Sequence, residues 1–197
     1  METFKYVEPT LEHEQEALDF INEFYEYNSD INGTGGLQRF LNNYPDWLKK
    51  LEEDRNRIPN EEKVPAVTYF LVRENDNRIV GMINIRLALN ERLRKFAGHI
   101  GFCIRPTERR KGYNKINLYL GLKVCQQHNI KEVLMDCDKD NLGSAKTMLA
   151  LGGVMVKEYF DDEIAKCLVQ DYVFDVDKCI ELNKSIYEPL VNSAKVK

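Results

Sequence analysis

The sequence has no long hydrophobic run and no excess of positive charge. No apolar stretch approaches the roughly 18 residues that a membrane-spanning helix needs. The N-terminus also lacks the basic start and the apolar stretch of a secretory signal. Lysine and arginine number 28 against 32 aspartates and glutamates, which gives a net charge of −4. Dedicated nucleic-acid binders carry a strong basic excess, so we expect neither nucleic-acid nor membrane partners.

Paired cysteines and metal-ligand spacings are also missing. The five cysteines are far apart and form no Cys-x-x-Cys pair, which argues against a disulfide framework and a cysteine zinc site. The three histidines show no metal-ligand spacing, so no metal is expected. Unpaired thiols are typical of a cytoplasmic protein, and we expect that location. The cysteines are Cys103, Cys125, Cys137, Cys167 and Cys179.

What is present is the composition of an ordinary globular protein. Of the 197 residues, 43% are hydrophobic and 30% are charged, so wholesale disorder is not expected. At about 150 residues per domain, the length predicts a single domain with an elaboration. We place the domain at residues 1–175 and regard residues 176–197 as a C-terminal tail with a weak helical pattern.

Apolar periodicity predicts a mixed α/β domain with helices packed on a central sheet. On the strand expected at 79–87, Ile79, Ile83 and Ile85 should share one face, and Asn84 and Arg86 the other. The helix that starts after Gly112 is apolar around much of its circumference, which indicates burial. The expected strands are 4–8, 67–72, 79–87, 97–104, 133–137, 154–160 and 164–174, and the expected helices begin near 11, 37, 45, 112 and 141.

The segment with the clearest chemistry is 105–114, Arg-Pro-Thr-Glu-Arg-Arg-Lys-Gly-Tyr-Asn, where a strand ends, a basic turn follows and a helix begins. A helix N-terminus has unpaired N–H groups and the positive end of a dipole, so it suits an anion. Gly112 lacks a Cβ and lets a ligand approach the backbone. A phosphate or pyrophosphate site is one interpretation, and a solvated basic turn is the other. The P-loop and Rossmann glycine patterns are both absent.

Three motifs carry a family resemblance. Residues 109–114 match the pattern [Gln/Arg]-x-x-Gly-x-[Gly/Ala] at all but its last position, residues 98–106 look like the strand before it, and 138–141 with the following helix look like a second conserved block. In these motifs the chain resembles the GNAT superfamily of N-acetyltransferases over about residues 1–175, and in particular a bacterial branch of predicted acetyltransferases. The resemblance implies a GNAT-like acyl-CoA N-acyltransferase fold, with a central, mixed, mostly antiparallel sheet flanked by helices.

The resemblance also implies acetyl-CoA as the cosubstrate. Its pyrophosphate would bind the N–H groups of 109–114, and its pantetheine would pair like an extra strand along 103–105. A backbone N–H near Cys103 or Ile104 would act as an oxyanion-type donor to the thioester carbonyl. Asn141 matches a family asparagine that contacts the cofactor, with a helix cap as the other interpretation. The implied cofactor-binding residues are Cys103, Ile104, Arg105, Arg109, Arg110, Lys111, Gly112, Tyr113, Asn114, Asn141 and Ser144.

Two positions depart from the family pattern. Asn114 stands where glycine or alanine is usual, and its side chain either crowds the pyrophosphate or binds it. Met148 stands seven residues after Asn141, where a tyrosine is common, and a thioether cannot protonate a leaving thiolate. A CoA thiolate is a tolerable leaving group without a dedicated acid, because thiol pKa values lie near 8.5.

The implied reaction is direct attack of a primary amine on the thioester in a ternary complex. An amine with a pKa near 10 must first lose a proton, so a base is needed. His99 is a candidate base or a core histidine, and Glu23 and Tyr25 are weaker candidates. Cys103 is either a small core residue or a nucleophile for a covalent route. The acidic first helix either attracts a cationic amine or is simply solvated.

We therefore predict an acetyl-CoA-dependent N-acetyltransferase acting on a small-molecule or peptide amine. The alternative within the same fold is a non-catalytic module that binds acyl-CoA, and a third hypothesis is an interaction domain with an unrelated basic turn. The resemblance leaves a homodimer open.

Overall fold

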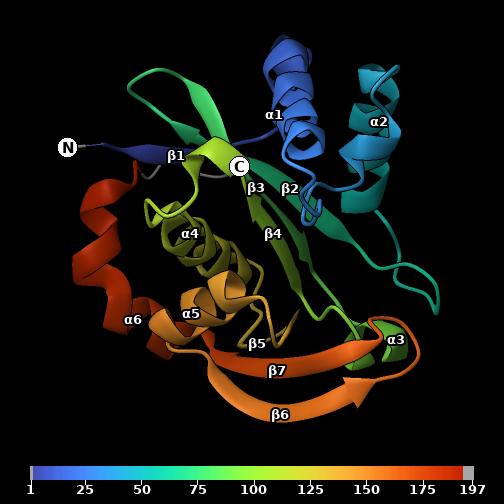
Figure 1. The fold of residues 1–197 in the computed structure, drawn as a ribbon, viewed down its shortest axis with the longest axis vertical. Helices are drawn as coiled ribbons and strands as arrows, with labels where there is room; N and C mark the ends of the chain where they lie inside the picture. The colour runs from blue at the N-terminus through green and yellow to red at the C-terminus, as the bar shows by residue number, and fades with distance from the viewer. Residues whose placement is uncertain (1, 193–197) are drawn as a thin grey trace.

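The computed structural model describes residues 2–192, which form two antiparallel sheets with helices on both sides (Figure 1). The first sheet has the order β1-β2-β3-β4, and the second has the order β5-β7-β6. The strands are β1 (Phe4–Val7), β2 (Ala66–Arg73), β3 (Arg78–Arg86), β4 (Ile100–Ile104), β5 (Glu132–Asp138), β6 (Val154–Asp161) and β7 (Cys167–Asp175). The α-helices are α1 (Glu14–Glu26), α2 (Tyr44–Arg55), α3 (Glu91–Lys95), α4 (Tyr113–Gln127), α5 (Leu142–Ala150) and α6 (Val176–Tyr187). This mixed architecture confirms the predicted fold class.

Two hydrophobic cores hold these layers together. One lies between the first sheet and the helices α1 and α2, and Phe20, Trp47 and Phe70 are fully buried in it. The other lies between both sheets and the helices α4, α5 and α6. Helix α4 is buried around most of its circumference, as its sequence predicts. Helix α6 contributes Val176 and Cys179 to the same core. No helix among residues 2–192 is long and apolar enough to cross a membrane.

The predicted hairpin of β2 and β3 is present, but a β-bulge changes its faces. Leu71 pairs with Gly81 and Val72 pairs with Ile79, so Val80 has no partner on β2. An extra residue in one strand breaks the alternation of side chains. Ile79 therefore packs in the core under α1 and α2, whereas Ile83 packs in the core under α4. The expectation that these two side chains share a face is wrong.

Three predicted element boundaries are also wrong, for local reasons. The strand expected from residue 164 begins at Cys167, after the left-handed Lys166 with φ of 56°. The helix expected from residue 37 is only a 3₁₀ turn, Leu37–Arg39, because Asn43 leaves helical geometry to cap α2 and its side chain accepts the N–H of Asp46. The third long strand starts at Ile100 rather than at residue 97, because Ala97 has a left-handed backbone with φ of 69°. A left-handed residue cannot continue an extended strand.

Candidate functional site

Strands β4 and β5 belong to different sheets and meet at one end only (Figure 1). His99 donates its N–H to Leu134 O at 2.7 Å, and the N–H of Leu134 donates to Nδ1 of His99 at 3.0 Å. Ala97 adds a bond from its N–H to Oδ2 of Asp136, at 2.8 Å. Within residues 2–192, no ladder of hydrogen bonds continues between β4 and β5 beyond this junction. The facing edges of the two strands therefore carry polar backbone groups that are open to a ligand.

The register of β4 decides which of its amides face this edge. Arg105 donates its N–H to Val80 O at 2.9 Å. In an antiparallel ladder the hydrogen-bonded positions recur every second residue, so Cys103, the register partner of Met82, also points its N–H at β3. The amide of Ile104 points the other way, toward β5. Of the two predicted oxyanion-type donors, the register therefore favours the N–H of Ile104 over that of Cys103, and both stay predictions.

The turn before α4 has the geometry of an anion cradle, which we define as the backbone amides of residues 110–114. Arg110 and Gly112 both have left-handed φ angles, of 66° and 85°. Alternating handedness turns successive N–H groups to one side and makes a concave anion site. No side chain caps α4, and no acidic residue lies in its first turn. A Cβ added at Gly112 would meet nothing within 4 Å, so the space beside the cradle is open.

A buried carboxylate holds this turn in place. Glu108 accepts hydrogen bonds from Arg73 at 2.9 Å and from Lys111 at 2.7 Å. Burial alone would raise the pKa of Glu108, but the hydrogen bonds from Lys111 and Arg73 outweigh it and hold the pKa below its usual value. The ammonium of Lys111 is thus committed to Glu108. Arg110 is exposed, and among the described residues its guanidinium has no hydrogen-bonded or ion-pair partner.

The side chain of Arg105, predicted to bind the cofactor, instead pairs with the first helix. It is buried, with Glu16 at 2.8 Å and Glu23 at 3.6 Å. Glu23 also accepts bonds from the N–H and Oγ1 of Thr107, both at 2.7 Å. These bonds remove Glu23 as a free base and neutralise part of the acidic helix. Tyr25 is exposed on the same helix, with no side-chain hydrogen bond among residues 2–192.

Two more predicted side chains turn away from the cradle. Arg109 donates from Nε to Ile104 O at 3.2 Å and to the hydroxyl of Ser29 at 2.7 Å. Tyr113 is buried, and its hydroxyl donates to Glu2 at 2.7 Å. Arg105, Arg109 and Tyr113 therefore shape the turn with their side chains, and only their backbone groups remain available to a ligand.

Asn114 lies where the first turn of α4 meets α5. Its Nδ2 approaches Oγ1 of Thr147 at 3.5 Å, and its Oδ1 is buried with no hydrogen-bond partner in the structure. The hydroxyl of Thr147 already donates to Gly143 O at 2.8 Å, so it cannot satisfy Oδ1. Asn141 caps α5 by accepting the N–H of Ser144 at 3.1 Å, which confirms the helix-cap interpretation of Asn141. An unpartnered buried acceptor is costly, and a bound N–H donor would relieve that cost.

His99 and Cys103 lack the properties that their predicted catalytic roles require. Burial and the nearby charges of Arg94 and Arg86 lower the pKa of His99 to about 4, and its Nδ1 is occupied by Leu134. His99 joins β4 to β5, which favours the interpretation as a core histidine, and its role as a base stays a prediction. Burial raises the pKa of the Cys103 thiol to about 12, so the reactive thiolate is absent at neutral pH.

Met148, which stands in place of a family tyrosine, is fully buried in the core beneath α4. Its thioether packs against apolar neighbours and supplies no proton to any reaction. The position therefore contributes to packing in this chain, and a proton for a leaving group must come from elsewhere.

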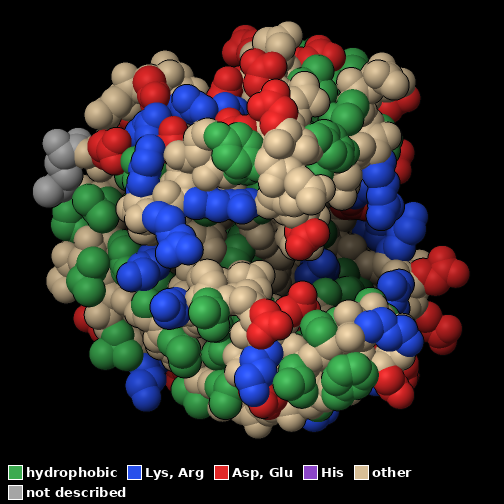
Figure 2. Space-filling view, viewed as in Figure 1, with side chains coloured by type: hydrophobic (Ala, Val, Ile, Leu, Met, Phe, Trp, Pro, Cys, Tyr) green, Lys and Arg blue, Asp and Glu red, His purple; other side chains and the backbone are tan. Residues whose placement is uncertain are grey.

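A groove that the sequence does not reveal lies between α3 and the open face of the second sheet. It has a chamber of ≈ 200 Å³ and an adjoining one of ≈ 90 Å³. The inner chamber reaches Gly98 and Leu134 at the β4–β5 junction. Figure 2 shows the surface hollowed between the half that carries α1 and α2 and the half that carries the second sheet. The sequence gives one indication of this polar face, because Asp136 is a charged residue within the otherwise apolar run 133–137.

The loop between α1 and α2 packs directly on β4. At Gly33 the loop presses on β4 so closely that an added Cβ would lie 2.3 Å from Gly101 O. The sulfur of Cys103 faces the same loop at Asn32. The loop therefore covers the α1-facing side of β4 next to the junction with β5.

Solved structures with the same fold include several acetyltransferases. RimJ from Mycobacterium smegmatis, in complex with CoA-disulfide, has a TM-score of 0.68 at 11% identity and covers 91% of this chain and 87% of its own. The microcin C7 self-immunity acetyltransferase MccE, in complex with acetyl-CoA and AMP, has a TM-score of 0.62 at 19% identity, with coverages of 88% and 92%. A spermidine N-acetyltransferase SpeG chimera from Vibrio cholerae and hSSAT has a TM-score of 0.62 at 10% identity, with coverages of 90% and 99%.

No curated protein matches the chain in sequence. The model of the acetyltransferase (GNAT) family matches residues 21–152, which include β4, the cradle, α4 and the cap of α5. This match spans most of the chain, and the fold agrees with it. The chain therefore belongs to the GNAT family of acetyltransferases, which use acetyl-CoA as their acetyl donor.

Proposed function

We propose that the protein transfers the acetyl group of acetyl-CoA to a primary amine of a small-molecule or peptide acceptor, by direct attack in a ternary complex. The observation that supports this most is the juxtaposition of an open anion cradle with an unpaired strand edge. The cradle suits a diphosphate, and the edge of β4 suits the amide groups of a pantetheine arm. Solved structures of RimJ and MccE contain CoA-disulfide and acetyl-CoA, which supports the same ligand here.

The residues present fit this ligand. The amides of 110–114 and the exposed guanidinium of Arg110 would hold the diphosphate. The unpartnered Oδ1 of Asn114 can accept a hydrogen bond from an N–H of the pantetheine arm. Ser144 follows the cap of α5, and its hydroxyl has no partner among the described residues, so it can bind the same ligand.

The chemistry then needs three things from the chain. The N–H of Ile104 would stabilise the negative charge that develops on the thioester oxygen. A base must take a proton from the acceptor ammonium before its nitrogen forms the C–N bond and the C–S bond breaks. The CoA thiolate can leave without a protein acid, because its conjugate thiol has a pKa near 8.5 and water can protonate it. Met148 is consistent with that route.

We also propose residues 1–175 as the catalytic domain, with α6 packed onto its core. The five cysteines are all free, which supports a cytoplasmic location.

Thermal unfolding with acetyl-CoA tests the binding half of the proposal. At about 100 times its dissociation constant, a ligand of the native state adds about 2.7 kcal/mol of stability. An unchanged melting temperature would favour an unrelated interaction domain. Thiol release with polyamines, aminoglycosides, amino acids and peptides tests the second half. Stabilisation without release for any amine would favour the acyl-CoA-binding module, to which the buried Met148 gives some support.

The variant Cys103→Ala tests direct attack against a covalent route. We expect this variant to keep more than about half of the wild-type turnover, because a buried thiol with a raised pKa acts as a small core residue. A covalent acyl-cysteine route instead predicts a loss of about 10⁶-fold, the order that follows removal of a catalytic nucleophile. Mass spectrometry of wild-type protein after exposure to acetyl-CoA provides the control, and we expect no acetyl adduct on Cys103.

A further inference from the structure

We propose that the groove beneath α3 binds the acceptor, and that Asp136 and Asp171 select a short aliphatic amine that carries a second cationic group. The inference rests on the proposed function, since it concerns the acceptor of that reaction. It starts from the position of the groove, whose inner chamber touches the junction where β4 and β5 separate. An acceptor seated there has its reacting nitrogen next to the open edge of β4.

The two carboxylates form a row on the groove-facing side of the second sheet. Asp136 on β5 and Asp171 on β7 are register partners, so their side chains stand about 5 Å apart on one face. Asp136 lines the inner chamber only, whereas Asp171 lines both chambers. One carboxylate thus faces the reacting end of an acceptor, and the other faces the part that extends outward.

Neither carboxylate forms an ion pair with a described residue, although Arg86 acts on the charge of Asp136 and Lys157 on that of Asp171. Among the described residues, no lysine or arginine nitrogen lies within 4.0 Å of Asp136 or Asp171. Arg86, the cation behind Asp136, donates to Ala97 O and Gly98 O at 2.9 Å each. Burial raises the pKa of both carboxyl groups. The charge of Asp136 raises the pKa of Asp171 further, whereas the ammonium of Lys157 and a hydrogen bond with Tyr159 partly offset this rise. A bound cation would relieve this shared negative charge.

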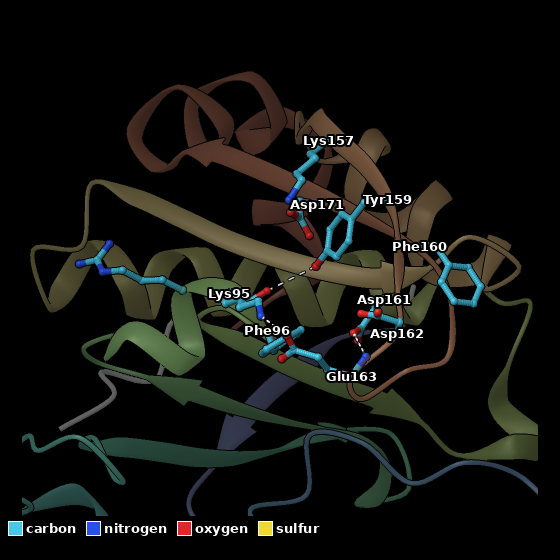
Figure 3. A pocket seen from close by; sticks show the side chains of 10 residues that line it. Lys95, Phe96, Lys157, Tyr159, Phe160, Asp161, Asp162, Glu163 and Asp171 are labelled. Atoms are coloured by element: carbon cyan, nitrogen blue, oxygen red, sulfur yellow. Dashed lines mark hydrogen bonds and ion pairs between the residues drawn. The ribbon is translucent and has the colours of Figure 1, made fainter.

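The basic side chains of the groove contact other groups as well, and of these only Lys157 also acts on Asp171. Lys95 pairs with Glu163 at 2.6 Å, and the ammonium of Lys157 lies 4.0 Å from the ring centroid of Tyr159. In Figure 3, Lys157, Asp171 and Tyr159 project from the sheet toward the segment of Lys95 and Phe96. Aromatic rings beside carboxylates favour an ammonium on an aliphatic chain over a hydrophilic anion. The remaining basic side chain, that of Arg94, would attract an acceptor with a carboxylate, and the experiment includes that case.

The size of the groove limits the acceptor. Chambers of ≈ 200 Å³ and ≈ 90 Å³ hold a chain of a few carbon atoms and leave no room for a folded protein surface. One ammonium would lie at Asp136, where this carboxylate is also placed to take the proton that the attacking nitrogen loses. The second would lie at Asp171. The carboxyl of Asp136 is then protonated and the nitrogen is neutral before the C–N bond forms.

The test compares three five-carbon amines that differ only at the far end: 1-aminopentane, 1,5-diaminopentane and 5-aminopentanoate. Each is titrated calorimetrically into the protein saturated with CoA, which has no acetyl group to transfer. We expect the diamine to bind about tenfold more tightly than 1-aminopentane, the effect of one charge-assisted hydrogen bond. In Asp171→Asn this preference should fall to about twofold, and Asp136→Asn should weaken all three amines by about tenfold.

Asparagine keeps the shape of each side chain, and at position 136 it can still accept the N–H of Ala97. The matched control is Asp162→Asn, which removes one negative charge from the outer rim of the same groove and should leave the preference unchanged. Equal binding of 1-aminopentane and the diamine by the wild type, tightest binding of 5-aminopentanoate, or a preference that survives Asp171→Asn would each overturn the inference. The titration needs no turnover, so absence of thiol release would refute the proposed function and leave this result standing.

Discussion

Replacing Gly112 with aspartate is expected to weaken CoA binding by about a hundredfold, because like charges forced together in a binding site cost several kcal/mol. Gly112 lies at the centre of the cradle with a φ of 85°, and no protein atom lies within 4 Å of the place where a Cβ would stand. The aspartate side chain would therefore occupy the open space in which we propose that the diphosphate binds. It would not disturb the packing of the unliganded protein.

The control for this prediction is Gly112→Asn. Asparagine has nearly the same shape as aspartate and tolerates a left-handed backbone about as well, but it carries no charge. Both variants should lose about 1 kcal/mol of stability from the backbone conformation. Calorimetric titration of both variants with CoA separates the effect of the added side chain's size from that of its charge. Thermal unfolding verifies that both variants are folded. If the aspartate variant binds CoA as tightly as the wild type, the diphosphate does not lie at the start of α4.

The second large effect that we expect is a loss of folding stability at acidic pH. His99 has its pKa lowered from 6.5 to about 4 by burial first, and then by the charges of Arg94 and Arg86. The unfolded chain takes up this proton near pH 6.5, whereas the folded chain resists it down to about pH 4. The unfolded state therefore binds more protons in this window, and stability must rise with pH across it. Above pH 6.5 the imidazole is neutral in both states and the effect is absent, whereas by pH 4 it has lowered the stability by about 3 kcal/mol.

The variant His99→Asn isolates this contribution. Oδ1 of asparagine stands the same number of bonds from Cα as Nδ1 of histidine, so it can still accept the N–H of Leu134. We expect the wild type to lose about 3 kcal/mol of stability more than the variant does between pH 6.5 and pH 4, because asparagine does not titrate. Urea unfolding at several pH values measures how the free energy of unfolding of each protein depends on pH. Parallel curves would mean that His99 is protonated in the folded protein or does not change its charge on folding.

Much of this architecture could be predicted because it depends on neighbours in sequence. The hairpin of β2 and β3, the burial of α4 and the anion cradle follow from local periodicity, from a turn and from a glycine before a helix. The β-bulge at Val80 could not be predicted, because only the pairing with β2 reveals it. Its effect is to reverse the face of Ile79, which a strict alternation assigns to the other core.

The candidate site was predictable in position and less so in its side chains. Arg105, Arg109 and Lys111 look equivalent in a basic run, but their partners are Glu16, Ile104 O and Glu108. Glu16 is distant in sequence, and nothing local shows which cation turns toward it. Similarly, Asp136 and Asp171 meet only because β5 pairs with β7 in one register. Long-range pairing thus decides which charges a ligand meets, and sequence patterns describe it poorly.

The contact between Gly33 and Gly101 limits how the loop between α1 and α2 can vary. A methyl group at residue 33 would overlap the backbone of β4, so any substitution there has to lift the whole loop off the strand. Position 33 is therefore closed to gradual variation. Directed evolution toward new acceptors should gain more from the groove beneath α3, where side chains such as Lys157 and Tyr159 line open space and can be exchanged one at a time.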